Sequence, residues 1–209
     1  MKIPNSTLHI ILRALQQYVK NAEDIEKIVI THALGAAAAA VAAGWIPGAG
    51  GAIATGIAIS FTLTMYYRLC KECGITMKKN IMKAVVSVAV AEIAAYFSVI
   101  IVTEIALSFI PGLGNVATTF IAGFVNFAMV YIAGLLFLMM MVKVFKAKKS
   151  VENMSEEELK EYMKESATKE NIAKMYKEAK ETYKSAKDDP SYSTDDVKPT
   201  NPDDDSLPD

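Results

Sequence analysis

Four long apolar segments separated by short connections dominate the pattern of hydrophobic and polar positions along this chain. They cover approximately positions 28–46, 51–69, 84–108 and 116–142. At about 1.5 Å of rise per residue, each segment is long enough as a helix to cross a hydrocarbon core of about 30 Å, the first two only just. The pattern therefore predicts an all-α integral membrane protein with four spans.

Amphipathic and polar sequence flanks these segments on both sides. Up to position 27, apolar residues recur every three to four positions, which predicts an N-terminal amphipathic helix over 1–27 with Ser6 as its N-cap. Ser155 and Glu158 form a capping box inside a charged helical region, 150–187, that breaks near position 167. The last residues, 188–209, are rich in Pro, Asp, Ser and Thr, which predicts a disordered acidic tail.

The two pairs of apolar segments repeat one another. The sequence WIPGAG at 45–50 recurs as FIPGLG at 109–114, in a register that continues downstream. Proline cannot continue a helix interior, so each motif predicts the tip of a helical hairpin. The membrane domain, 28–144, then consists of hairpins 28–70 and 84–144 with tips at 46–50 and 110–114. The tip residues are Ile46, Pro47, Gly48, Gly50, Ile110, Pro111, Gly112 and Gly114.

Lysine and arginine are unevenly distributed among the connections. They precede the first segment, fill the connection between the second and third, and follow the fourth, whereas both tips are uncharged. Under the positive-inside rule, both termini and the central connection are cytoplasmic, with both tips on the other side of the membrane.

Four polar residues inside the apolar segments are candidates for function. Glu92 and Glu104 lie in the third segment, where an ionised carboxylate costs at least about 2.5–3.5 kcal/mol. They could serve an ion or proton path, or they could be structural carboxylates that are neutral or bonded to Asn126 or His32. The two carboxylates lie roughly 120° apart around a helix, so they do not form a single file. The structural interpretation is therefore favoured for both, and His32 is interpreted as an interfacial hydrogen-bonding residue.

No arrangement of residues in the sequence points to catalysis, a cofactor or a metal. Cys70 and Cys73 form a C-x-x-C pair, but no other cysteine exists and His9 and His32 are poorly placed to complete the four ligands of a structural zinc site. The chain has no P-loop, nucleophile elbow or zinc-protease motif. It also lacks a basic surface of the kind that binds nucleic acid. We therefore expect neither an enzyme nor a nucleic-acid-binding protein.

Four stretches resemble a known family: 31–33, 44–50, 65–75 and 109–115. They are similar to the YcjF-like bacterial membrane family, catalogued as the domain of unknown function six-nine-seven, over about 28–144. The resemblance implies a helical hairpin module of the bacterial inner membrane, often fused to or encoded near small GTPases. This chain departs from the family in having Gly51 and Ala52 where many members place an acidic residue after the first tip. It also carries no GTPase domain, so a GTPase partner would act in trans.

The leading functional hypothesis is a non-enzymatic membrane anchor or scaffold. Its partners would be the lipid bilayer and a cytoplasmic GTPase or similar protein recruited through the terminal helices, and small-residue helix faces leave a homo-oligomer open. One alternative is a small oligomeric channel in which Glu92 lines a path. Another is a water-soluble helical bundle that inserts conditionally.

Overall fold

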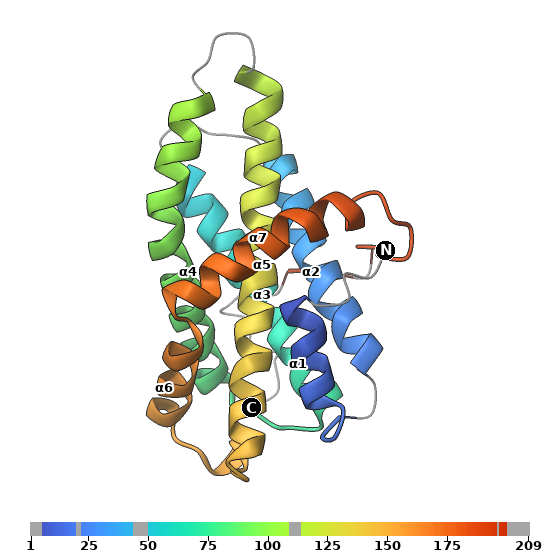
Figure 1. Ribbon diagram of the computed structural model, residues 1–209, viewed down its shortest axis with the longest axis vertical. Helices are drawn as coiled ribbons and strands as arrows, with labels where there is room; N and C mark the ends of the chain where they lie inside the picture. Colours follow the sequence, from blue (N-terminus) through green and yellow to red (C-terminus); the bar gives the residue numbers. More distant parts are fainter. Residues whose placement is uncertain (1–5, 20–21, 44–49, 109–113, 196, 200–209) are drawn as a thin grey trace.

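The chain folds into a bundle of α-helices, and the residues that the structure describes contain no strand (Figure 1). The structure is a computed structural model that describes residues 6–19, 22–43, 50–108, 114–195 and 197–199, with side chains for all of these except 22, 50–54 and 100–122. The elements are α1 (Thr7–Leu15), α2 (Ala22–Ala43), α3 (Gly50–Cys73), α4 (Lys79–Ser108), α5 (Gly114–Lys146), the 3-10 turn η1 (Val151–Asn153), α6 (Glu156–Ser166) and α7 (Lys169–Ala186). The predicted all-α class is confirmed, whereas the repeated-hairpin arrangement stays a prediction.

The central helix of the bundle is α5, against which α1, α2, α3, α4, α6 and α7 all pack. Gly134 allows both α2 and α3 to approach α5 closely: a Cβ atom there would lie 3.1 Å from Met65 Sδ on α3 and 3.1 Å from Val29 Cγ1 on α2. Next to it, the buried Tyr66 hydroxyl of α3 donates a hydrogen bond of 2.8 Å to the carbonyl oxygen of Ala133. A glycine at this position therefore fixes how tightly three helices meet.

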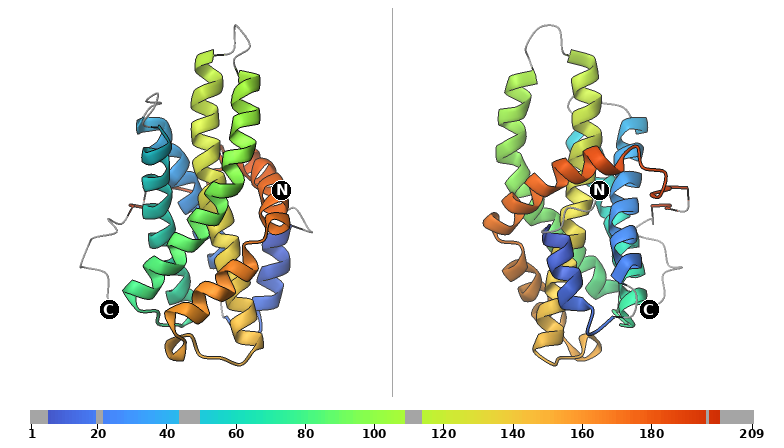
Figure 2. Two further views of the ribbon diagram at one scale, coloured as in Figure 1. Left: turned by 90° about the vertical axis from the view of Figure 1, so that its left-hand side faces the viewer. Right: turned by 45° about the vertical axis from the view of Figure 1, so that its right-hand side comes forward.

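The two helix pairs that follow one another in sequence extend to different heights. At one end of the bundle, α4 and α5 project beyond α2 and α3 (Figure 2). We call the projecting residues, 98–108 of α4 and 114–122 of α5, the distal end. The opposite end, where α4 begins, α5 ends and α6 lies, is called the base (Figure 1).

Side-chain caps set the boundaries of the C-terminal helices as the sequence predicted. The Ser155 hydroxyl accepts a hydrogen bond from the Glu158 backbone N–H, and the Glu158 carboxylate accepts one from the Ser155 N–H, which confirms the capping box. The Ser155 N–H and then Lys149 lower the pKa of Glu158. The predicted break is also confirmed, because α6 ends at Ser166 and Thr168 caps α7.

The N-terminal region corrects one expectation. Ser6 caps the first helix as predicted, accepting a hydrogen bond from the His9 N–H. However, the single amphipathic helix expected over 1–27 is wrong: α1 ends at Leu15, and α2 already begins at Ala22. Because α1 packs on both α5 and α2, the chain must turn between the two helices, and the buried side chain of Val19 lies in this turn.

Part of the C-terminal tail contacts the bundle. Asp189 accepts hydrogen bonds from the backbone N–H and hydroxyl of Ser191, at 2.9 Å and 2.7 Å. Farther along, Val197 is buried, and the Thr64 hydroxyl of α3 donates a hydrogen bond of 3.4 Å to the carbonyl oxygen of Lys198. Residues 200–209 lie outside the described residues, so the assignment of 188–209 to a disordered tail stays a prediction.

Candidate membrane-embedded region

Three described helical segments are long and apolar enough to cross a membrane: Glu23–Ala43, Lys79–Val99 and Gly123–Lys146. They support the interpretation of the chain as a membrane protein. The second of the four predicted spans, 51–69 in α3, is not among the segments found in the described part of the chain. Which membrane the protein occupies, and on which side its termini lie, stay predictions.

The amphipathic helix α7 lies across the middle of α4 and α5 (Figure 1). The ring of Tyr176 packs edge-on at 5.3 Å from the ring of Phe97 on α4 and at 5.6 Å from that of Phe124 on α5. Seven residues, or about two turns, farther along α7, the ring of Tyr183 lies 4.9 Å from the ring of Phe127. These aromatic contacts fix the height at which α7 crosses the bundle.

The end of α2 reaches this same height. A Cβ atom at Gly123 of α5 would lie 3.0 Å from Val41 Cγ2 of α2 and 3.2 Å from the Tyr183 hydroxyl of α7. Only two residues of α2 follow Val41, because the helix ends at Ala43. Beyond α7, therefore, α2 contributes almost nothing, and the distal end consists of α4 and α5.

The position of α7 limits how deeply the bundle can enter a bilayer. From position 98 to its end, α4 has eleven residues, which span roughly 16 Å as a helix. A hydrocarbon core is about 30 Å thick. The outer face of α7 carries exposed charged side chains such as Lys177 and Glu181, and these cannot lie in hydrocarbon. A complete span through α4 or α5, including the candidate segments Lys79–Val99 and Gly123–Lys146, is therefore incompatible with a docked α7.

Most of the predicted tip residues lie outside the described residues. These are Ile46, Pro47 and Gly48 of the first tip and Ile110, Pro111 and Gly112 of the second. Gly50 and Gly114 are the first residues of α3 and α5. The side chain of Glu104 is also outside the described residues, so its role stays a prediction.

The other three polar candidates lie in different surroundings, and the buried Nε2 of His32 has no hydrogen-bond partner among the described residues. Glu92 is half-buried on α4, five residues from Phe97 toward the base, and thus on the side of α7 away from the distal end. His32 is fully buried, and its Nδ1 lies 2.7 Å from the carbonyl oxygen of Ile28 on the same helix. Asn126 is buried on α5, which packs against the helix of His32. The structural interpretation of all three stays a prediction.

The two cysteines are buried thiols at the end of α3. Burial, and to a lesser degree Glu72, raises the pKa of Cys73 to about 11, so this thiol is un-ionised at neutral pH. Neither Cys70 nor Cys73 forms a disulfide. Among the described residues, no group of three His, Cys, Asp or Glu side chains is placed to hold a metal ion.

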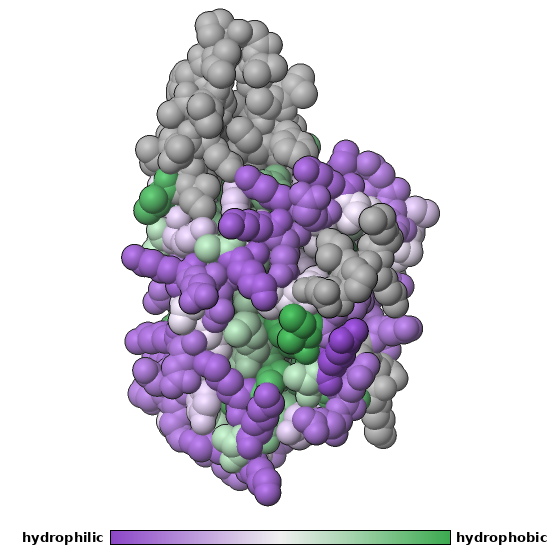
Figure 3. Space-filling view, viewed as in Figure 1, coloured by the Kyte–Doolittle hydropathy of each residue, from purple (hydrophilic) through white to green (hydrophobic). Residues whose placement is uncertain are grey.

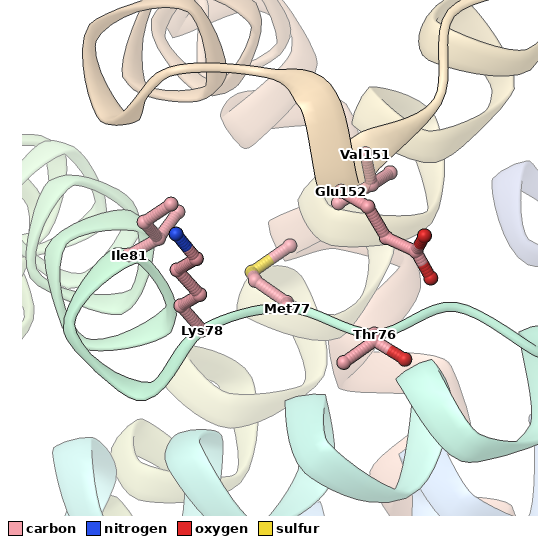
Figure 4. Close-up of a pocket in the computed structure, with 6 residues that line it drawn as sticks. All are labelled: Thr76, Met77, Lys78, Ile81, Val151 and Glu152. Atoms are coloured by element: carbon pink, nitrogen blue, oxygen red, sulfur yellow. The ribbon is translucent and has the colours of Figure 1, made fainter. Parts of the chain in front are cut away.

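A shallow cleft of about 350 Å³ lies at the base, between the α3–α4 connection and η1. Figure 4 shows the Met77 side chain pointing into it, with the Lys78 amine and the Glu152 carboxylate directed away from one another. The residues that line it are Thr76, Met77, Lys78, Ile81, Val151 and Glu152. This lining contains no nucleophile paired with a base, so the cleft supplies no catalytic constellation.

No family model matches this chain, and no curated protein and no solved structure is significantly similar to it. The resemblance to the YcjF-like family, and the GTPase partner that it implies, therefore stay predictions.

The structure also brings out a feature that sequence analysis passed over. Lys177, Lys180 and Lys184 recur at intervals of three and four residues, so they share one flank of α7. That spacing was the available signal, but only the contacts of α7 show which way this flank points.

Proposed function

We propose that this protein is a non-enzymatic membrane anchor and scaffold, whose distal end enters a bilayer while its base stays in water. One observation carries the proposal: an apolar helical end projects past a base that is covered by amphipathic helices. Between positions 98 and 123 the only charged residue is Glu104. Below the distal end, α6 and α7 bury one face against α4 and α5, α1 buries one face against α5 and α2, and all three helices expose polar residues on the other face.

The exposed face of α6 is a suitable surface for a recruited protein. Glu157, Glu161 and Glu165 recur every four residues and are all exposed, so they form one acidic row on the helix. The carboxylate of Glu165 pairs with the amine of Lys143 at 3.3 Å. A partner for this row would present basic residues. That the partner is a GTPase rests on the family resemblance.

A second candidate function is favoured by the burial of α5. Within its candidate span, Gly123–Lys146, 83% of the residues are buried by the chain's own helices. A helix that is covered by protein on all sides does not need lipid around it. This observation supports a water-soluble bundle that inserts only under certain conditions.

Membrane fractionation with two matched variants separates these proposals. Wild-type chain should remain with the membrane through alkaline carbonate extraction. Val102→Glu places a carboxylate in the distal end and should weaken retention, because a charged group in hydrocarbon is costly. Ile10→Glu is the control, since Ile10 is 53% exposed on α1 at the base.

The two variants and the wild type give distinct outcomes. Anchoring through the distal end predicts a loss of membrane retention for Val102→Glu alone. Equal behaviour of both variants would contradict insertion through that end. Recovery of the wild type as a monodisperse soluble species without detergent would overturn constitutive anchoring and support the conditional bundle.

A further inference from the structure

Five lysines lie along one flank of α7 and its C-cap. At about 100° per residue, they fall on one side of the helix, and Asn171, Glu178 and Thr182 fall on the opposite side. The buried residues Ile172 and Ala179 lie between the two flanks, facing the bundle. We call the five lysines the lysine row: Lys169, Lys177, Lys180, Lys184 and Lys187.

The contacts of Glu178 show that its flank faces the base. Its carboxylate accepts hydrogen bonds from the backbone N–H of Thr7 at 2.8 Å and from the Thr7 hydroxyl at 2.6 Å. Thr7 is the first residue of α1, and α1 lies on the base side of α7 (Figure 1). The lysine row, on the opposite flank, therefore faces the distal end.

A second set of contacts gives the same orientation independently. Thr182, on the Glu178 flank, donates to the Tyr131 hydroxyl at 3.5 Å, whereas Tyr183 lies beside Gly123. Tyr131 is eight residues farther from the start of α5 than Gly123 and thus nearer the base. Tyr183 therefore lies nearer the distal end than Thr182 does. Continuing in the same direction around the helix leads to the lysine row, which thus faces the distal end.

The lysine row is well placed to meet charged groups outside the protein. Lys169, Lys177, Lys184 and Lys187 are exposed. Lys184 pairs with Glu181 at 3.4 Å, and Lys187 pairs with Asp188 at 3.2 Å. Exposed ion pairs of this kind are weak, so they leave the amines able to bind stronger anions. In Figure 3, hydrophilic surface covers much of α7.

We propose that the lysine row binds the anionic phospholipid headgroups of the leaflet that the distal end enters. This inference rests on the proposed membrane anchoring and adds the lipid class that is recognised and the depth that is reached. An apolar end above a row of lysines matches the order of hydrocarbon and phosphate in a leaflet. With α7 in the headgroup layer, the distal end spans about one leaflet.

Vesicle binding by the full-length chain tests this proposal. Binding is measured to phosphatidylcholine vesicles and to mixed phosphatidylcholine–phosphatidylglycerol vesicles, for the wild type and two triple variants. The row variant is K169Q/K177Q/K184Q. The control, K148Q/K164Q/K174Q, removes the same charge from exposed lysines outside the row.

We expect the wild type to prefer the anionic vesicles. Each lysine near an anionic surface contributes about fivefold in binding, so the row variant should lose at least about tenfold of that preference, and the control should lose much less. Equal losses in the two variants, or no anionic preference in the wild type, would overturn the proposal that the lysine row binds anionic headgroups. If the wild type bound neither kind of vesicle, that result would instead contradict the proposed anchoring.

A site-specific probe checks the orientation of α7. A fluorophore attached to Lys177→Cys, in the lysine row, should be quenched by a quencher carried on lipid headgroups. The same fluorophore on Lys174→Cys, outside the row, should be quenched less. Equal quenching at both positions would contradict the orientation even if the vesicle preference were observed.

Discussion

The pairs α2–α3 and α4–α5 begin from related sequences but occupy different environments. Tyr67 and Tyr131 are equivalent positions of the repeat. Tyr67 is half-buried on α3, whereas Tyr131 on α5 is 1% exposed and its hydroxyl accepts a hydrogen bond from Thr182 of α7. The difference arises because the terminal helices cover the second pair far more than the first.

The side chains on the two helix pairs explain why the terminal helices cover α4 and α5 more than α2 and α3. The exposed and half-buried side of α2 is rich in alanine, at Ala38, Ala39 and Ala42. The second pair offers Phe97 and Phe124, which the tyrosines of α7 contact. Aromatic side chains bury far more surface than alanine, so amphipathic helices gain more by packing on α4 and α5. The two helix pairs, whose connections carry similar motifs, are thus packed differently.

The largest expected effect is a difference in membrane depth between position 113, in the α4–α5 connection, and position 49, in the α2–α3 connection. If the distal end enters a bilayer to the proposed depth of about one leaflet, Leu113→Cys and Ala49→Cys in a C70A/C73A background should both resist labelling from outside the cell. A quencher in the acyl chains should quench a fluorophore at Leu113→Cys more strongly than one at Ala49→Cys. Lys78→Cys, at the base, is the control and should label only after permeabilisation. Labelling of both tips from outside would establish complete spans and an undocked α7.

A second experiment probes the packing that joins the two pairs. Gly134→Leu inserts a side chain where α2, α3 and α5 meet, and we expect it to lower the free energy of unfolding by about 1–3 kcal/mol. Gly56→Leu is the control, since no atom lies within 4 Å of a Cβ there. It should be neutral or stabilising because leucine favours the helix more than glycine. Thermal unfolding followed by circular dichroism measures the stability of both variants. Equal stabilities would contradict close packing of α2, α3 and α5 at Gly134.

The reactivity of Cys73, the last residue of α3, reports on how well the end of this helix is buried. The pKa of Cys73 is raised to about 11 from an ordinary value of 9.0. The reactive thiolate at pH 8 is therefore about a hundredfold scarcer in the folded chain than in the unfolded one. Alkylation of Cys73 at pH 8 should be slower by at least this factor before denaturation and should accelerate as the pH rises toward 11. Rapid alkylation of the folded chain would show that the base of α3 is open.

The smallest effect tests how α7 holds α1 against the second pair. Glu178→Gln weakens the charge-assisted hydrogen bonds from Thr7, and we expect the weakened bonds to cost about 1 kcal/mol. Hydrogen exchange at the amides of α1 should increase accordingly. Glu181→Gln, which loses only an exposed pair with Lys184, should leave this exchange unchanged. Similar exchange in the two variants would show that Glu178 does not hold α1.

Local patterns predicted much of the fold. The apolar periodicity indicated the helices, and side-chain caps at Ser6 and Ser155 appeared as expected, because a cap depends on residues only three positions apart. The prediction of helix bounds failed in the N-terminal region, where contacts between residues far apart in the sequence determine the structure. In place of the single helix expected over 1–27, the chain forms α1 and α2, and α1 packs on α5, a contact that no nearby residue specifies.

By itself, the sequence determined an all-α chain with segments apolar enough for a membrane, because helix periodicity and hydropathy are local properties. Only the tertiary structure showed that α7 crosses α4 and α5 at Phe97 and Phe124. It also showed that the lysine row faces the distal end, since this depends on the contact of Glu178 with Thr7. Those two residues are separated by 171 positions, and the sequence alone carries no signal for such a pair.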